Sequence, residues 1–232
     1  MPNPNAVLDS EGAKAVPGVC IACHGGTYDA TKHNMSAAAR FLPFDTPSFL
    51  YDTVNAQFSA PSQADTFRIL NAIVRSSSTE GTAQKTSQGV TFQGAITSQT
   101  IRDLIDGWYS WCVGVDTKGC SIDDQNHRFI PSGTCGPNSV TCGWNQNPDT
   151  YQQFPRVVCR TCHVAHSDIF NWEDYTFVTR STSLSQICTA LSSYSMPFAQ
   201  VPYNEFWTDT VGSSAFTSLL PTSACQLKPP PQ

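Results

Sequence analysis

Residues 20–24 read Cys-Ile-Ala-Cys-His, and residues 159–163 read Cys-Arg-Thr-Cys-His. Both pentapeptides follow the pattern Cys-X-X-Cys-His, which is the signature of covalent c-type haem attachment. Two residues between the cysteines place both sulfurs where they can bond the two vinyl groups on one edge of a porphyrin, and the adjoining imidazole then lies under the iron. With ten cysteines and five histidines in 232 residues, one match is expected by chance only about 0.01 times. Two matches therefore predict two haem groups.

Each pentapeptide assigns three residues to one haem. We expect the cysteines to form thioether bonds with two covalently bound haem c groups, and the histidines to be the proximal axial ligands. The first haem takes Cys20, Cys23 and His24, and the second takes Cys159, Cys162 and His163. The alternatives are a zinc site and a redox dithiol. Zinc ribbons pair knuckles about 15 to 20 residues apart, whereas residues 25–158 separate these motifs. A redox dithiol needs no following histidine.

The distal ligand of the second haem is expected to be Met196. Met196 precedes Pro197 downstream of the second motif, which resembles the distal loop of class I c-type cytochromes, where a Met-Pro pair supplies the sixth ligand. A thioether is a soft donor that stabilises ferrous iron and raises its reduction potential. The alternative is an ordinary core methionine.

The first haem has no equivalent methionine, because Leu42 stands before Pro43 where Met196 stands before Pro197. A leucine cannot bind iron. The side chains that could take the distal position come from several parts of the chain. They are His33, which we rank first, then His127, then Met35 or an open position. His166 follows a proximal ligand too closely to bind its own haem and could reach only the other one.

Six cysteines remain outside the two motifs, and an even remainder is typical of disulfides in an oxidising compartment. Six cysteines allow 15 pairings, of which we prefer the local set. That set is Cys112–Cys120, Cys135–Cys142 and Cys188–Cys225. The alternative is free buried thiols.

The composition excludes several classes of partner. Only 13% of residues are charged and the formal net charge is −5, with no basic run, which argues against nucleic acid and against anionic lipid surfaces. No apolar stretch reaches the length of a membrane span. The first residues lack the pattern of a signal peptide, so we expect that a leader was removed before this numbering begins. Haem attachment and disulfides together indicate a periplasmic, extracellular or cell-surface location.

Apolar residues at helical spacing predict most of the secondary structure. We expect loop over residues 29–47, a Ser/Thr/Gly-rich linker over residues 76–94 and irregular chain over residues 112–151. The helices are expected over residues 10–24, 64–75, 101–109, from about 156 through the second motif, 184–191 and 206–220.

Both halves of the chain resemble class I c-type cytochrome units, and the whole resembles exported bacterial dihaem proteins. The segments that carry this resemblance are residues 23–26, 41–45, 107–109, 159–165, 196–197 and 206–207. The resemblance implies a mainly α fold with two cytochrome c-like haem-binding halves joined by a disulfide-stapled, loop-rich segment. The corresponding boundaries are 1–111, 112–150 and 151–232.

This resemblance implies electron transfer between redox protein partners, with no assigned catalytic residue. An alternative is an enzyme, a dihaem peroxidase-like oxidoreductase, which would need an open distal site on one haem. A third possibility is a homo-oligomer, in which subunits of a conducting filament lend a histidine to a neighbour's haem. Four indoles are expected to pack on the porphyrins, with plain core filling as the alternative. These are Trp108, Trp111, Trp172 and Trp207.

Overall fold

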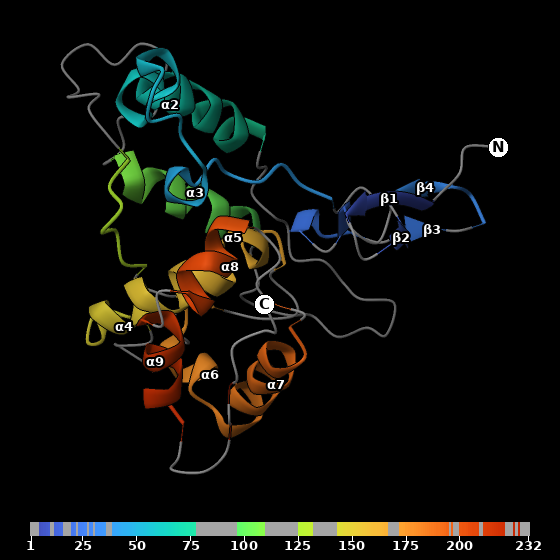
Figure 1. Cartoon of the computed structure of the whole chain (residues 1–232), viewed down its shortest axis with the longest axis vertical. Helices are drawn as coiled ribbons and strands as arrows, with labels where there is room; N and C mark the ends of the chain where they lie inside the picture. The colour runs from blue at the N-terminus through green and yellow to red at the C-terminus, as the bar shows by residue number, and fades with distance from the viewer. Residues whose placement is uncertain are drawn as a thin grey trace.

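The computed structural model shows a mainly α protein, as the sequence predicts. Figure 1 shows the helices in two groups, with α2 and α3 at one end and α4, α6, α7 and α9 at the other. The part of the chain that the structure describes comprises residues 5–9, 12–15, 20–21, 23–26, 28–29, 31–35, 39–77, 97–109, 125–131, 143–166, 172–194, 196, 200–208, 211–220, 225 and 227.

Two antiparallel hairpins open the chain and project to one side of the helices in Figure 1. Strand β1 (Asn5–Asp9) pairs with β2 (Gly12–Ala15), and β3 (Tyr28–Asp29) pairs with β4 (Asn34–Met35). The expected helix over residues 10–24 is therefore wrong in its first part. Asp9 faces Gly12 where the first hairpin closes, and both residue types favour turns over helix interiors. Among the described residues of this range, helix is present at Cys20, Ile21, Cys23 and His24, within the motif itself.

The expected loop over residues 29–47 is also not entirely loop, because it contains β4 and the start of a short 3-10 helix. This helix, η1 (Thr46–Ser48), has Pro47 in its first turn, where the fixed φ of proline favours helical backbone. A second 3-10 turn, η2 (Ala56–Phe58), is capped by Asn55, whose side chain accepts a hydrogen bond from the backbone N–H of Gln57.

Helices α2 (Ala60–Ser77) and α3 (Thr97–Tyr109) confirm the predicted helices in this part of the chain. They are joined by polar contacts between their side chains. Arg75 donates to both carboxylate oxygens of Asp106, at 2.5 and 2.9 Å. Asn71 donates to the hydroxyl of Tyr109 at 3.1 Å. The linker over residues 76–94 lies almost wholly outside the described residues.

The second motif is entered through consecutive short helices. Helix α4 (Pro148–Gln153) begins with a proline and has Asp149 in its first turn, both of which favour a helix start. It falls within residues that we expected to be irregular, so that boundary is wrong. A π-helical turn, η3 (Pro155–Cys159), and α5 (Arg160–His163) then carry the motif, which confirms a helix opening near Arg156.

The remaining chain folds into four helices in the described region. They are α6 (Tyr175–Val178), α7 (Ser181–Ser192), α8 (Gln200–Trp207) and α9 (Val211–Ser218). The expected helix over residues 184–191 is confirmed. The single helix over 206–220 is wrong, because α8 ends at Trp207 and α9 starts at Val211. Thr208, Asp209 and Thr210 separate them, and these residue types have low helix propensity.

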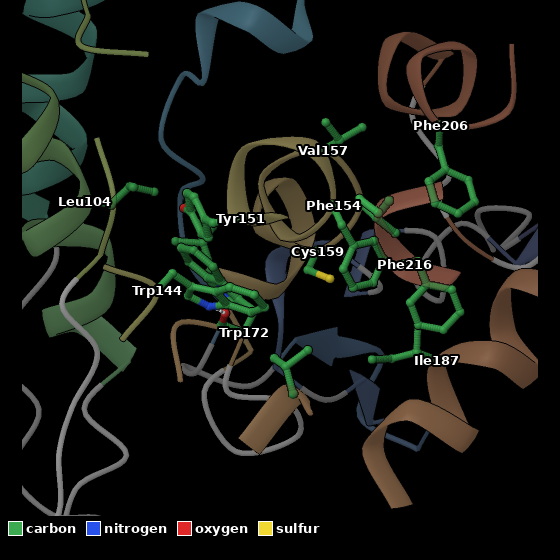
Figure 2. Packing of buried hydrophobic residues seen from close by; sticks show 14 of the residues in the cluster. Leu104, Trp144, Tyr151, Phe154, Val157, Cys159, Trp172, Ile187, Phe206 and Phe216 are labelled. Carbon is green, nitrogen blue, oxygen red and sulfur yellow. Dashed lines mark hydrogen bonds between the residues drawn. The ribbon is translucent and has the colours of Figure 1, made fainter. Parts of the chain in front are cut away.

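One buried cluster collects apolar residues from both groups of helices. Leu104 of α3 belongs to it together with Trp144, Tyr151 and Trp172, as Figure 2 shows. The rings of Tyr151 and Trp172 are stacked at 6.2 Å, and the indole N–H of Trp144 donates to the carbonyl of Trp172 at 2.9 Å. Trp108 and Trp172 are each 1% exposed and both belong to this cluster.

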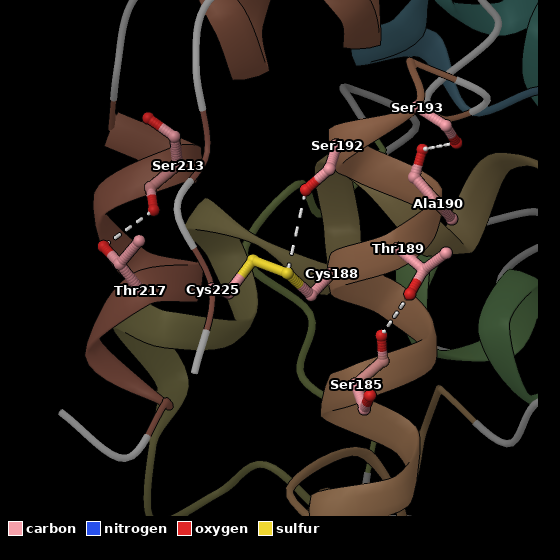
Figure 3. Close-up of a disulfide and its surroundings, with 9 residues drawn as sticks. All are labelled: Ser185, Cys188, Thr189, Ala190, Ser192, Ser193, Ser213, Thr217 and Cys225. Carbon is pink, nitrogen blue, oxygen red and sulfur yellow. Dashed lines mark hydrogen bonds between the residues drawn. A yellow bond between two sulfur atoms is a disulfide. The ribbon is translucent and has the colours of Figure 1, made fainter. Parts of the chain in front are cut away.

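A disulfide joins Cys188 of α7 to Cys225, with Cα atoms 5.9 Å apart (Figure 3). This confirms one of the three expected pairings. The cysteines of the other two, at positions 112, 120, 135 and 142, lie outside the described residues. Among the helices that the structure describes, none combines the length and the apolar character needed to cross a membrane.

Candidate functional site

The two Cys-X-X-Cys-His motifs meet in the fold. Cys23 Sγ lies 3.2 Å from Cys162 Sγ, although 139 residues separate the two cysteines. Each of these residues is the second cysteine of its motif, and all four motif cysteines, Cys20, Cys23, Cys159 and Cys162, lack a disulfide partner. The structure therefore assembles one site from two segments that are distant in sequence.

Gly25, the residue after His24, makes this approach possible. A Cβ at position 25 would stand 2.8 Å from the carbonyl oxygen of Ala165 and 3.9 Å from Cε1 of His166. Gly25 also has a φ of +67°, which glycine adopts without the steric cost that a side chain brings. The backbone that follows the first motif thus packs directly on the backbone that follows the second.

His24 is oriented by the backbone of Arg40. Its Nδ1 lies 2.6 Å from the carbonyl oxygen of Arg40, and the N–H of Arg40 donates to the carbonyl of His24 at 2.9 Å. A carbonyl can only accept, so Nδ1 carries the proton and Nε2 is left as the nitrogen with a lone pair. Metal-binding histidines are commonly held in this way, with one ring nitrogen donating to a carbonyl and the other directed at the metal.

His163 occupies the equivalent place in the second motif. Burial, together with the nearby charge of His166, lowers the pKa of His163 to about 4. The two imidazole rings lie 6.0 Å apart. At neutral pH His163 is therefore uncharged, which is the form that can donate a lone pair to a metal.

The four motif cysteines differ in their surroundings. Cys20 is exposed, Cys23 and Cys162 are half-buried, and Cys159 is fully buried. Figure 2 shows Cys159 within the aromatic cluster that contains Phe154, and this burial raises the pKa of its thiol. The hydrogen bond with Cys162 and the charge of His24 outweigh partial burial and lower the pKa of Cys23 to about 7. The hydrogen bond and burial raise the pKa of Cys162, so Cys23 is the more acidic thiol of the pair.

A buried ion pair fixes the second motif. Arg160 donates through Nε and Nη2 to the two carboxylate oxygens of Asp45, both at 2.7 Å. Its Nη1 lies 3.3 Å from the hydroxyl of Tyr151, and its guanidinium lies 5.3 Å from the ring centre of Trp108. Burial alone would lower the pKa of Arg160, but the Asp45 carboxylate and Tyr151 more than offset it, and the pKa is raised. Arg160 remains a cation.

Amide side chains hold the segment that supplies Asp45. Asn71 accepts from the backbone N–H of Phe44 at 2.7 Å and donates to its carbonyl at 3.0 Å. Gln125 donates to the same carbonyl at 3.1 Å and accepts from the N–H of Thr46 at 2.9 Å. Sequence reasoning picked out residues 41–45 as a segment but gave none of these polar residues a role.

The structure places the candidate distal ligands in different surroundings. His33 is exposed at the turn between β3 and β4, and its Nδ1 lies 3.2 Å from the hydroxyl of Tyr28. Met35 lies in β4, opposite Tyr28. Met196 is half-buried and packs against the core cluster, and Pro197 lies outside the described residues.

Two further histidines complete the candidates. His127 is exposed and lines a cavity of about 490 Å³ together with Tyr109, Arg128 and Arg156. His166 lies beside Gly25, as described above. The structure thus brings His166 to the first motif, whereas His33 and His127 stand in the hairpin and the cavity wall.

Trp207 is the indole that best fits a role at a cofactor. Its side chain is buried, and its Nε1 has no hydrogen-bond partner among the described residues. A buried donor without a partner costs free energy, so a carboxylate such as a porphyrin propionate would satisfy it. Trp111 lies outside the described residues.

Within the described residues, no group of three or more His, Cys, Asp or Glu side chains is arranged to hold a metal ion directly. Comparison with protein-family models, with curated proteins and with solved structures finds no match to this chain.

Proposed function

We propose that this chain is an exported dihaem c-type cytochrome that passes electrons between redox protein partners. The observation that carries the proposal is the meeting of the two attachment motifs, with the sulfurs of Cys23 and Cys162 3.2 Å apart. Motifs in contact would tether two porphyrins as close neighbours within one chain. Each haem, when bound, supplies an iron that takes up and releases one electron.

The residues present fit two covalently attached haems. The carbonyl of Arg40 holds His24 with Nε2 available for a metal, and burial keeps His163 neutral. Trp207 offers a buried N–H for a propionate. These three features supply what a haem site requires of its protein, namely a directed imidazole, a neutral imidazole and a donor for the acidic edge of the porphyrin.

The distal residues would give the two haems unequal potentials. Met196 is the proposed sixth ligand of the second haem, and a thioether favours the ferrous state. His33 is the proposed sixth ligand of the first haem, and its Nδ1 lies 3.2 Å from the hydroxyl of Tyr28. A Met/His site beside a His/His site sets a direction for electron flow, because the electron moves toward the higher potential.

The proposal includes two cytochrome c-like halves in an oxidising compartment, periplasmic or outside the cell. The Cys188–Cys225 disulfide supports the compartment, because disulfides persist where thiols are not kept reduced.

Covalent pigment is the direct test. Protein produced in a host with haem-attachment machinery should keep its colour after denaturation and acid-acetone extraction, and its mass should exceed that of the polypeptide by two haem groups. The double substitution Cys20→Ser with Cys23→Ser should remove one haem mass, and Cys159→Ser with Cys162→Ser should remove the other. Cys188→Ser with Cys225→Ser is the matched control and should keep both. A colourless polypeptide of unmodified mass would contradict the proposal.

Optical spectra separate electron transfer from the alternatives. Two low-spin, six-coordinate haems that ignore peroxide and carbon monoxide support the electron carrier. A high-spin haem that binds carbon monoxide and reacts with peroxide would support a dihaem peroxidase-like oxidoreductase instead. Electron microscopy of the purified protein would show whether it forms filaments.

A further inference from the structure

The close approach of Cys23 and Cys162 has a consequence for the chain before haem is attached. Their sulfurs lie 3.2 Å apart, and a disulfide bond brings two sulfurs to about 2.05 Å. A closing movement of about 1 Å, shared between two half-buried side chains, would therefore suffice. We propose that in the haem-free chain Cys23 and Cys162 form a disulfide that links the two motifs and withdraws one cysteine from each.

The geometry favours this link over a disulfide within the second motif. Cys159 is fully buried in the aromatic cluster (Figure 2). A small oxidant would therefore have to reach a fully buried sulfur, whereas Cys23 and Cys162 are both half-buried. Cys162 faces Cys23 instead.

Two contacts hold the partners in place. Gly25 packs on the carbonyl of Ala165 just beyond the motifs, and Asp45 binds Arg160 inside the second motif. Because these contacts belong to the folded chain, the pairing should depend on folding. In an unfolded chain, closing a loop across 139 residues is disfavoured relative to closing the short loop within one motif.

The bond forms by thiol–disulfide exchange with a small disulfide oxidant. The Cys23 thiolate attacks one sulfur of the oxidant, which releases one thiol and leaves a mixed disulfide on Cys23. Cys162 then loses its proton, attacks the Cys23 sulfur and releases the second thiol. The two cysteines are oxidised by two electrons in all, and the oxidant is reduced to two thiols that take up the two protons.

The link would act on both haem sites together, a consequence that rests on the proposed function. Each motif needs both thiols to form two thioether bonds. One disulfide across the motifs therefore blocks complete attachment at both sites, and reduction restores both.

Peptide mapping tests the link itself. Full-length chain from a host without haem-attachment machinery is incubated with oxidised glutathione, free thiols are alkylated, and the protein is digested with trypsin. Cleavage after Arg160 separates Cys159 from Cys162. The expected product is peptide 15–32 linked to peptide 161–180. Peptide 157–160 linked to 161–180, or four alkylated motif cysteines, would overturn the proposal.

Matched variants assign the partner on peptide 15–32, which carries two cysteines. Cys20→Ser should leave the linked product unchanged, whereas Cys23→Ser should abolish it. Oxidation in concentrated urea should replace the link with disulfides inside each motif, and persistence of the link there would contradict a role for the fold.

The proposed function and the link can fail separately. If the chain forms the disulfide but never gains covalent pigment, even after reduction and exposure to haem and the attachment machinery, the disulfide proposal is supported and the cytochrome proposal is wrong. If the chain gains two haems but its haem-free form never forms the disulfide, the cytochrome proposal is supported and the disulfide proposal is wrong.

Discussion

Asp45 and Arg160 form a bidentate ion pair across 115 residues of sequence, with both N···O distances at 2.7 Å. The side chains are 5% and 1% exposed. Asp45 belongs to the segment that follows the first motif, and Arg160 is the second residue of the second motif. The pair therefore ties together the two parts of the chain that form the candidate site.

Asp45→Asn should destabilise the protein by about 3–5 kcal/mol, because it leaves a buried guanidinium without its counter-charge. Urea unfolding of the haem-free chain measures this loss. Asp29→Asn is the control, since its ion pair with Lys32 is exposed and its removal should change the midpoint little. The double substitution Asp45→Leu with Arg160→Met should recover much of the loss, because an apolar pair leaves no buried charge. Equal midpoints for Asp45→Asn and Asp29→Asn would contradict the role of the buried pair.

Gly25→Ala should destabilise the contact between the motifs by about 1–3 kcal/mol, since it adds a strained backbone conformation to a steric clash. The Cβ would stand 2.8 Å from the carbonyl oxygen of Ala165, and the φ at this position is positive. Gly25→Asn separates the two causes, because asparagine tolerates a positive φ but brings the same Cβ. If space decides, both variants unfold at similarly reduced urea concentrations. An asparagine variant with wild-type stability would show that only the backbone conformation matters.

The haem-free chain should lose stability as the pH falls from about 6.5 to 4. Burial lowers the pKa of His163 to about 4, below its ordinary value of about 6.5. The unfolded chain therefore binds this proton more tightly, so protonation favours unfolding, with a loss of up to about 3 kcal/mol. Urea unfolding across this pH range measures the slope. His163→Gln cannot titrate and should flatten it, and an unchanged slope in that variant would show that other groups are responsible.

The sequence was most informative where one segment decides its own structure. The apolar periodicity of residues 101–109 predicted α3, and Leu184, Ile187 and Leu191 predicted α7 correctly. Short polar interruptions were harder to interpret. The break between Trp207 and Val211 and the hairpin that closes at Asp9 and Gly12 both depend on a few turn-forming residues within otherwise helical patterns.

Contacts between distant segments could not be predicted from a single sequence. Nothing in the residues themselves indicates that Asp45 pairs with Arg160 or that Cys23 faces Cys162, because any acid could pair with any base and ten cysteines offer many partners. The motifs gave the identity of the candidate ligands, and the fold supplied their neighbours. The carbonyl of Arg40 at His24 is one such neighbour, since every residue carries a carbonyl and no pattern marks this one.

Removing the Cys188–Cys225 disulfide should destabilise the protein by about 4 kcal/mol in the chain-entropy model, because it frees a loop with a sequence separation of 37 residues. The test compares Cys188→Ser with Cys225→Ser against the wild-type protein in urea, and then repeats the comparison under reducing conditions. Reduction should bring the wild type close to the double variant. If the two differ greatly when reduced, the serines themselves, and not the lost cross-link, cause the change.

Met196→Leu should lower the reduction potential of one haem and leave the other unchanged. Leucine has a similar volume, so the packing of this half-buried side chain against the core is kept, while the thioether is lost. The fall should be a fraction of the roughly 0.8 V range that axial ligands span. A spectroelectrochemical titration resolves the two haems. His33→Gln is the counterpart and should act on the other haem, with loss of its His/His signature in magnetic circular dichroism. If both substitutions affect the same haem, or Met196→Leu affects neither, the assignment of the distal ligands is wrong.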